Sequence, residues 1–268
     1  MKKILIPVLL LLAIFSVSGE SWSQKKVKLV IGATPVPHAE ILEQAKPLLA
    51  KKGIELEIKV FTDYVIPNLA LADKSLDANY FQHLPYLESF SKEKKLSLSS
   101  IGAVHFEPLG LYSKKIKKLS ALKAGDKVAV PNDTTNEARA LILLANNGLL
   151  TLKDPKNLKS TKADVASYKV KIEIVELEAA QITRSLVSVT AAVINGNYAI
   201  DAKLDPLKDA IISEGPKSIS AKTYGNIVVV RKGDENRPEL KELVKVLKSA
   251  EIKKFIADKY KGAVVAAD

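Results

Sequence analysis

Residues 27–60, VKLVIGATPVPHAEILEQAKPLLAKKGIELEIKV, decide the fold class. Residues 27–31 alternate in polarity, which predicts a strand, and residues 39–52 carry apolar side chains at helical spacing before Gly53. Residues 54–60 alternate again and predict a second strand. A strand, a helix and a strand in this order form a βαβ unit, whose crossover is right-handed.

The same pattern returns in the second half of the chain. Residues 127–130 predict a strand, and residues 138–144 predict a helix that ends at Asn147-Gly148. The tail, residues 238–261, is predicted to be helical throughout. Further strands are predicted at residues 101–106, 109–113, 170–177, 191–194, 210–213 and 227–231. Alternating strands and helices predict an α/β fold with parallel sheets that are covered on both faces.

Residues 1–19 have the features of a secretory signal peptide. Lys2 and Lys3 precede an apolar run over residues 4–15, and a small-residue stretch follows at residues 16–19. A membrane anchor is the weaker alternative, because the run is too short to span a bilayer and Pro7 interrupts it. We therefore expect export to the periplasm or another extracytoplasmic site.

Composition excludes several classes of function. The chain has no cysteine, so it has no disulfides, no cysteine-type zinc site and no thiol chemistry, and the usual acyl anchor of a lipoprotein is not expected. The net charge of +11 comes mostly from lysines spread along the chain, and arginine is scarce. This spread argues against nucleic acid as a partner, and an anionic membrane surface is the better candidate.

No catalytic or metal-binding pattern is evident. The three histidines, His38, His83 and His105, do not have the spacing of a zinc-binding helix, so neither a metal nor a cofactor is predicted. There is no Gly-x-Ser-x-Gly elbow. Four carboxylates could pair as acid and base, although nothing in their spacing requires it: Asp63, Asp77, Glu107 and Asp133.

The residues that follow the predicted strands indicate a ligand site. In α/β sheets, ligands bind beyond the carboxyl ends of the strands. Five such ends are rich in hydrogen-bonding or aromatic side chains: residues 34–38, 62–64, 105–107, 132–134 and 195–198. Five unrelated polar turns are the competing explanation.

The strongest local signal is Asn132 to Arg139. Thr134 and Glu137 have capping-box spacing, which predicts a helix start with free N–H groups, and Arg139 lies one turn inside. A helix start and a guanidinium suit a carboxylate or a phosphate. Because no phosphate-binding glycine pattern is present, a small carboxylate is favoured. An ordinary capped helix with a surface arginine remains possible.

Aromatic residues are concentrated in residues 79–86, in a chain that is only 6% aromatic. Phe81 and Tyr86, together with Tyr64 and His105, could wall an apolar pocket with a few polar groups, which is the usual make-up of a small-molecule site. Aromatic walls also suit a thioether sulfur. For any one of these rings, core packing is the simpler explanation.

Several of these segments together resemble the methionine-binding proteins of the NlpA lipoprotein family. The resemblance runs from about Val27 to the C-terminus and is carried by residues 32–41, 61–64, 76–83, 131–139, 175–181 and 192–199. It implies a type II-like periplasmic-binding-protein fold, in which two crossover strands near residues 107–111 and 224–227 join two α/β lobes. Residues 26–107 with 227–268 would form one lobe, and residues 108–226 the other.

The resemblance also implies roles for particular residues. Arg139 would clamp the carboxylate of an amino acid, and Asn136, Asn195 and Asn226 would bond its amino and carboxylate groups. Five side chains would surround the thioether: Tyr64, Phe81, His83, Tyr86 and His105.

The implied function is delivery of methionine, the L-enantiomer first, to the inner-membrane permease of an ABC importer. The protein would be a monomer and not an enzyme. Three alternatives stay open: a transferase or hydrolase on the same fold that uses Asp63 or Glu107 with His105, a surface interaction protein, and a binding protein for D-methionine, another apolar amino acid or a methionyl dipeptide.

Overall fold

The computed structural model describes residues 26–215 and 218–267, so the predicted signal peptide lies outside the described residues. A six-stranded sheet in the order β13-β4-β12-β3-β1-β2 forms the centre of what we call lobe 1. Its elements are β1 (Val27–Ala33), a one-turn π-helix η1 (Pro35–Ala39), α1 (Glu40–Ala50), β2 (Ile54–Val60), α2 (Ile66–Ala72), β3 (Ala78–His83), α3 (Leu84–Lys94), β4 (Leu98–Phe106), β12 (Asn226–Arg231), α8 (Pro238–Leu247), α9 (Ala250–Tyr260) and β13 (Val265–Ala266).

A five-stranded sheet in the order β11-β5-β10-β6-β9 forms the centre of lobe 2, with β7 and β8 paired beside it. The strands are β5 (Gly110–Tyr112), β6 (Lys127–Pro131), β7 (Leu150–Leu152), β8 (Val165–Tyr168), β9 (Glu173–Leu177), β10 (Ala191–Ile194) and β11 (Ile212–Ser213). The helices are η2 (Leu119–Ala121), α4 (Thr134–Asn146), η3 (Lys162–Asp164), η4 (Ala179–Gln181), α5 (Ile182–Ser185), α6 (Gly196–Asp201) and α7 (Ile219–Thr223).

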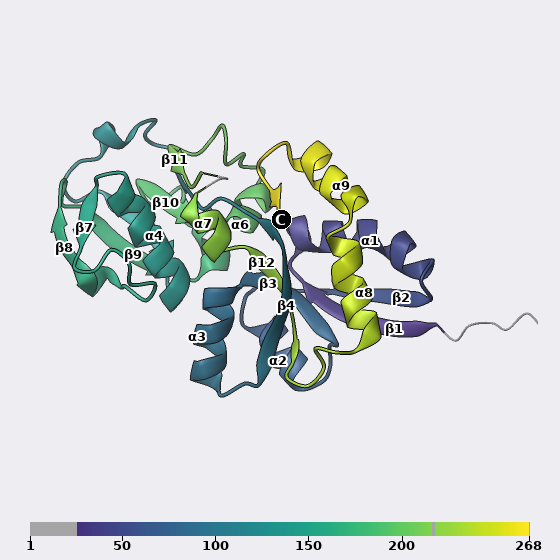
Figure 1. Ribbon diagram of the computed structural model, residues 1–268. Coiled ribbons are helices and arrows are strands. Elements are labelled where there is room, and N and C mark those ends of the chain that lie inside the picture. Colours follow the sequence, from purple (N-terminus) through teal and green to yellow (C-terminus); the bar gives the residue numbers. More distant parts are fainter. Residues whose placement is uncertain (1–25, 216–217, 268) are drawn as a thin grey trace, which may run out of the picture.

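Figure 1 shows the two lobes side by side, lobe 1 on the right with β1, β2 and α8, and lobe 2 on the left with α4 and β10. The chain passes from lobe 1 to lobe 2 between β4 and β5, and it returns between β11 and β12. This arrangement agrees with the predicted two-lobed fold.

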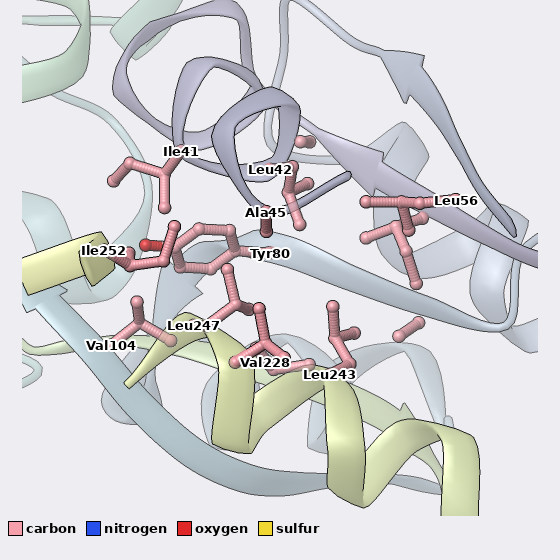
Figure 2. Packing of buried hydrophobic residues seen from close by; sticks show 14 of the residues in the cluster. Ile41, Leu42, Ala45, Leu56, Tyr80, Val104, Val228, Leu243, Leu247 and Ile252 are labelled. Carbon is pink, nitrogen blue, oxygen red and sulfur yellow. The ribbon is translucent and has the colours of Figure 1, made fainter. Parts of the chain in front are cut away.

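The predicted βαβ unit is present. β1 pairs with β2 in parallel along its whole length, from Val27 opposite Ile54 to Ala33 opposite Val60. The buried face of α1 packs on these strands because Ile41, Leu42 and Ala45 recur at helical spacing. Figure 2 shows these three side chains near Leu243 and Leu247 of α8, with the ring of Tyr80 among them.

The prediction of wholly parallel sheets is wrong. β1 is parallel to β2 and β3, and β6 is parallel to β9 and β10, but β12 is antiparallel to β3 and β4. In lobe 2, β5 is antiparallel to β10 and β11. The reason is topological: β4 leads out of lobe 1 and β12 leads back into it, so two neighbouring strands run in opposite directions.

One helical boundary and one strand also differ from the prediction. The tail is two helices, because α8 ends at Leu247 and Ser249 caps α9 by accepting a hydrogen bond from the Ile252 N–H at 3.4 Å. The segment 78–83, predicted only as an aromatic cluster, is the central strand β3, and all of its residues are buried. Among the described residues, no helix is long and apolar enough to cross a membrane.

Replacing Leu243 by alanine should test the packing of α8 on lobe 1. Leu243 is fully buried, so the substitution leaves a cavity and should lower the free energy of unfolding by about 2–5 kcal/mol. Urea unfolding followed by circular dichroism measures the change. Lys241→Ala, an exposed position on the same helix, is the control and should stay within about 0.5 kcal/mol of the wild type.

Candidate functional site

The carboxyl ends of several strands meet at a small cavity between the two lobes, with a volume of about 20 Å³. It lies where parallel-strand folds bind their ligands. The lining side chains come from both lobes, and they include every residue of the predicted site except His105: Tyr64, Phe81, Gln82, His83, Tyr86, Glu107, Asn136, Arg139, Asn195, Gly196, Asn197 and Asn226.

Lobe 1 supplies an aromatic wall. Tyr64 follows β2, while Phe81 and Tyr86 come from β3 and the first turn of α3. The centre of the Tyr64 ring lies 5.8 Å from that of Phe81 and 5.9 Å from that of Tyr86. The Tyr86 hydroxyl donates to the backbone carbonyl of Tyr64 at 2.8 Å. The wall is therefore fixed by ring contacts and by a hydrogen bond to the loop that carries Tyr64.

Lobe 2 supplies a polar wall from the start of α4. The helix begins at Thr134, and its N-cap is Asp133, whose carboxylate accepts from the Asn136 N–H at 3.0 Å. The predicted capping box of Thr134 and Glu137 is wrong because Thr134 already lies inside the helix. Glu137 instead accepts from the backbone N–H of Lys162 at 2.7 Å. A helix therefore starts in the predicted segment, but its N-cap is Asp133, one residue before the predicted Thr134.

Arg139 lies one turn into α4 and is buried. Its Nε and Nη2 donate to the two carboxylate oxygens of Glu214 at 2.9 and 2.5 Å, and Nη2 also donates to the carbonyl oxygen of Glu107 at 3.0 Å. The guanidinium carbon lies 4.3 Å from the centre of the Tyr224 ring. Burial opposes the charge, but the Glu214 carboxylate outweighs it and raises the pKa of Arg139. Within the described chain, Nη1 makes no hydrogen bond, so this nitrogen remains available to a ligand.

Amide side chains connect this helix start to the rest of the cavity. The Asn136 Oδ1 accepts from the Asn195 Nδ2 at 2.9 Å and lies 3.1 Å from the His83 Nε2. His83 Nδ1 accepts from the Tyr86 N–H at 3.2 Å, so the proton of the neutral ring is on Nε2. Burial and the Arg139 charge lower the pKa of His83 to about 3. The Asn195 Oδ1 is buried without a hydrogen-bond partner, which leaves one acceptor unsatisfied at the cavity.

Behind the cavity, Glu107 joins two buried histidines. The His105 Nε2 lies 2.7 Å from the Glu107 Oε1, and the His38 Nε2 lies 3.4 Å from the same oxygen. His105 also bonds Tyr80 through Nδ1, and it does not line the cavity, so the structure does not place it among the rings that would surround a thioether. Asn226 lines the cavity and accepts from the His38 Nε2 at 2.9 Å, which sets the orientation of its amide.

This cluster is also the one group of side chains in the described chain with metal-ligand geometry, the donor atoms lying within 4.8 Å of one another. Hydrogen bonds already use those donor atoms, because both Nε2 atoms face the carboxylate while Thr34 and Tyr80 bond the Nδ1 atoms. Burial lowers the pKa of His38 to about 4 and that of His105 to about 3, and it raises the pKa of Glu107. The cluster therefore has the geometry of a structural hydrogen-bond network.

Two hydrogen bonds close the cavity across the lobes. The Tyr64 hydroxyl donates to the Asn197 Oδ1 at 2.5 Å, and the Tyr198 hydroxyl donates to the Thr62 carbonyl oxygen at 3.1 Å. Among the lining residues, Gln82, Glu107, Gly196 and Asn197 are absent from the predicted site. Three of these four, Glu107, Gly196 and Asn197, lie in the polar segments that follow predicted strands. The sequence therefore predicted the segments that line the cavity, but not which of their side chains face it.

The side chains that line the cavity have the chemistry that suits a small zwitterion with an apolar tail. The cavity presents the Arg139 guanidinium, the Glu107 carboxyl group and the unsatisfied amide oxygen of Asn195. Opposite these groups lie the rings of lobe 1. Two α/β lobes that enclose a cavity lined from both sides define a periplasmic-binding-protein fold of type II.

Known proteins share this sequence and fold. A family model described as NlpA lipoprotein matches residues 29–267. The methionine-binding lipoprotein MetQ of Bacillus subtilis (strain 168) is 43% identical, over 99% of this chain and 98% of its own. A nutrient binding protein from Burkholderia cenocepacia, bound to methionine, has a TM-score of 0.85 and 42% identity over 90% of this chain and all (100%) of that one.

A periplasmic substrate-binding protein of an ABC transporter from Coxiella burnetii has a TM-score of 0.84 and 44% identity, over 89% of this chain and 100% of its own. The chain belongs to the NlpA lipoprotein family. The resemblance inferred from the sequence motifs is thus confirmed, and the three relatives described above are named as methionine-binding, nutrient-binding and substrate-binding proteins.

Stability should fall on acidification because His83 is buried as the neutral ring. Its pKa is about 6.5 in the unfolded chain and about 3 in the folded one, so its contribution is complete above pH 6.5 and is lost progressively as the pH falls towards 3. Between about pH 7 and about pH 5, His83 alone should remove about 2 kcal/mol of unfolding free energy. Urea unfolding at both pH values measures it.

His83→Gln is the matched variant, since glutamine can donate to Asn136 but does not titrate. Its unfolding free energy should fall by about 2 kcal/mol less than that of the wild type over the same interval. An identical pH dependence in the two proteins would contradict the assignment. His38 and His105, whose pKa values are also lowered, should keep part of the dependence in the variant.

Proposed function

We propose that this protein is an extracytoplasmic substrate-binding protein that holds methionine, the L-enantiomer in preference, between its lobes and delivers it to an ABC importer. One observation carries the proposal: the same cavity is lined by aromatic rings from lobe 1 and, opposite them, by Arg139 and amide side chains from lobe 2. The methionine-binding names of relatives at about 40% identity supply the ligand class.

The ligand's charged groups would lie against lobe 2. Its carboxylate would accept from the Arg139 Nη1 at the start of α4, where the helix dipole favours an anion. It would also accept from the Asn136 Nδ2, which would exchange one of its two 3.0 Å contacts with the Asp133 carboxylate for the ligand. Its ammonium would donate to the free Asn195 Oδ1 and to the Glu107 carboxylate. Asn226, at the start of β12, and His83 of lobe 1 would complete these contacts.

The thioether would lie among Tyr64, Phe81 and Tyr86, where sulfur contacts the ring edges. His105 would act only through Glu107, since it stands one layer behind the cavity.

Transport would depend on closure of the lobes, here taken as residues 26–107 with 227–268 and residues 108–226. The ligand contacts both lobes and so stabilises the closed form, and the closed surface would dock on the inner-membrane permease as a monomer. Export through residues 1–19 would bring the protein to the periplasm or another extracytoplasmic site, where relatives named as periplasmic or as lipoproteins function. The protein would release its ligand unchanged.

The decisive experiment identifies what the purified protein carries. The protein is denatured, the released small molecules are identified by mass spectrometry, and the refolded ligand-free protein is titrated by calorimetry with L-methionine, D-methionine, leucine and a methionyl dipeptide. Release of intact methionine, with L-methionine binding most tightly, supports the proposal. Release of a reaction product, or tighter binding of any other ligand, would overturn it in this form.

Arg139→Ala should weaken methionine binding by at least about tenfold, because a desolvated charge-assisted contact is lost. Calorimetry on ligand-free protein measures the change. Arg184→Ala, which removes the same charge from an exposed position of lobe 2, is the control and should leave the affinity unchanged. Since loss of Arg139 also leaves Glu214 unpaired, Asn195→Leu provides a second variant outside the ion pair, with an expected loss of about 10–100-fold.

Unchanged affinity in both Arg139→Ala and Asn195→Leu would remove the polar wall of lobe 2 from the binding site. A thermal unfolding transition in each variant shows that it is folded before the titration.

A further inference from the structure

The segment between β5 and β6 carries an unusual concentration of positive charge. Residues 113–123, SKKIKKLSALK, contain five lysines and no acidic residue. All five lysine side chains are exposed: Lys114, Lys115, Lys117, Lys118 and Lys123. Elsewhere in the described chain many lysines pair with a carboxylate, such as Lys28 with Glu57, but none of these five does.

The segment is held in a fixed conformation with its lysines outward. Ile116 and Leu119 pack against the lobe 2 core, and Leu122 is buried in it, so every third residue is an apolar anchor. The Ser113 hydroxyl accepts from the N–H groups of Lys115 and Ile116 at 2.9 and 3.0 Å. The spacing of the anchors leaves four of the lysines in two pairs on the solvent side, and Lys123 follows the last anchor. We call residues 113–123, with these five lysines, the basic loop.

The ends of the basic loop are tied to lobe 2. The Ser113 hydroxyl donates to the Thr190 carbonyl oxygen at 2.6 Å. At the other end, the carboxylate of Asp126 accepts from the Lys123 N–H at 2.7 Å and from the Thr190 hydroxyl at 3.0 Å, so hydrogen bonds occupy this nearby acid.

The surroundings of the basic loop add one lysine and two exposed apolar side chains. Lys208 lines one groove together with Lys114 and Lys117, and the carboxylates near it are Asp209, in the groove, and Asp205, 3.2 Å from the Lys208 Nζ. Val187, which is 68% exposed, precedes the Ser188 carbonyl that accepts from the Lys115 Nζ, and Leu207, 51% exposed, precedes Lys208.

We propose that the basic loop is a docking surface for an anionic phospholipid membrane. Lysine ammonium groups are compact, hydrated charges that suit a surface of anionic headgroups, each contributing modestly and additively. Residues 113–123 hold no arginine or aromatic ring, the side chains with which proteins recognise nucleic acids. Val187 supplies an apolar side chain beside Lys115 that can enter the headgroup region. This surface is separate from the cavity between the lobes and goes beyond the proposed binding of methionine.

Sedimentation with lipid vesicles, without any small ligand, tests the proposal. The protein should bind vesicles that contain phosphatidylglycerol, should bind phosphatidylcholine vesicles far more weakly, and should lose binding as salt rises from about 0.05 to about 0.5 M, because the Debye length shrinks. The variant with Lys114→Gln, Lys115→Gln, Lys117→Gln and Lys118→Gln should bind at least about tenfold more weakly. Replacing the same four residues by arginine keeps the charge and should keep the binding.

In the matched control, four lysines in and between α8 and α9 are replaced by glutamine: Lys241, Lys245, Lys248 and Lys253. The loop and control glutamine variants share the same N-terminus and net-charge change, so a difference between these two reports on position. Equal loss in the loop and control variants would overturn the proposal, as would equal binding to the two kinds of vesicle. Tighter binding of the loop to duplex DNA than to vesicles would assign it to nucleic acid and equally overturn it. Circular dichroism establishes that each variant is folded.

Discussion

The site depends on a buried ion pair, Arg139 with Glu214. Arg139 belongs to α4 of lobe 2, and Glu214 lies where the chain begins its return to lobe 1. Glu214 also accepts from the Leu109 N–H at 2.9 Å, and Arg139 donates to the Glu107 carbonyl, so the pair holds both connections between the lobes. Removing one member of such a pair leaves a buried charge without compensation, at a typical cost of about 3–5 kcal/mol. The guanidinium thus has two roles, fixing the connections and presenting Nη1 to the cavity.

Around this pair the cavity is kept nearly free of other charge. Burial lowers the pKa of His38, His83 and His105 well below neutral pH, so all three rings are neutral hydrogen-bonding groups there. Amides connect them to the helix start. A neutral polar network of this kind fixes the orientation of each amide while leaving the Arg139 guanidinium and the Glu107 carboxyl group to face a ligand. Recognition of a zwitterion then depends on a few directed contacts.

Sequence was informative where a pattern is local. The βαβ unit followed from the spacing of Ile41, Leu42 and Ala45, and the helix start at residues 132–139 followed from its polar residues, although the cap is Asp133. Contacts over long separations could not be predicted. Glu214 is 75 positions from Arg139, and no pattern in either segment predicts that the two residues form an ion pair. His105 was expected at the cavity because it lies near the end of a strand, but its ring is fully buried between Tyr80 and Glu107, and Glu107 occupies the cavity wall in its place. The antiparallel direction of β12 could not be predicted either, because the direction of a strand depends on how the chain runs between the lobes and not on the residues of the strand.

The hydrogen bonds from Tyr64 to Asn197 and from Tyr198 to Thr62 join the lobes without involving any bound molecule. Part of the free energy of the closed form therefore comes from the protein itself, and it adds to the apparent affinity for whatever lies inside. The same two bonds must break before the contents can leave. The rate at which a bound molecule dissociates would therefore depend on these two tyrosine hydroxyls as well as on the contacts of the molecule itself. A partner protein that formed hydrogen bonds with the same hydroxyls would accelerate the release.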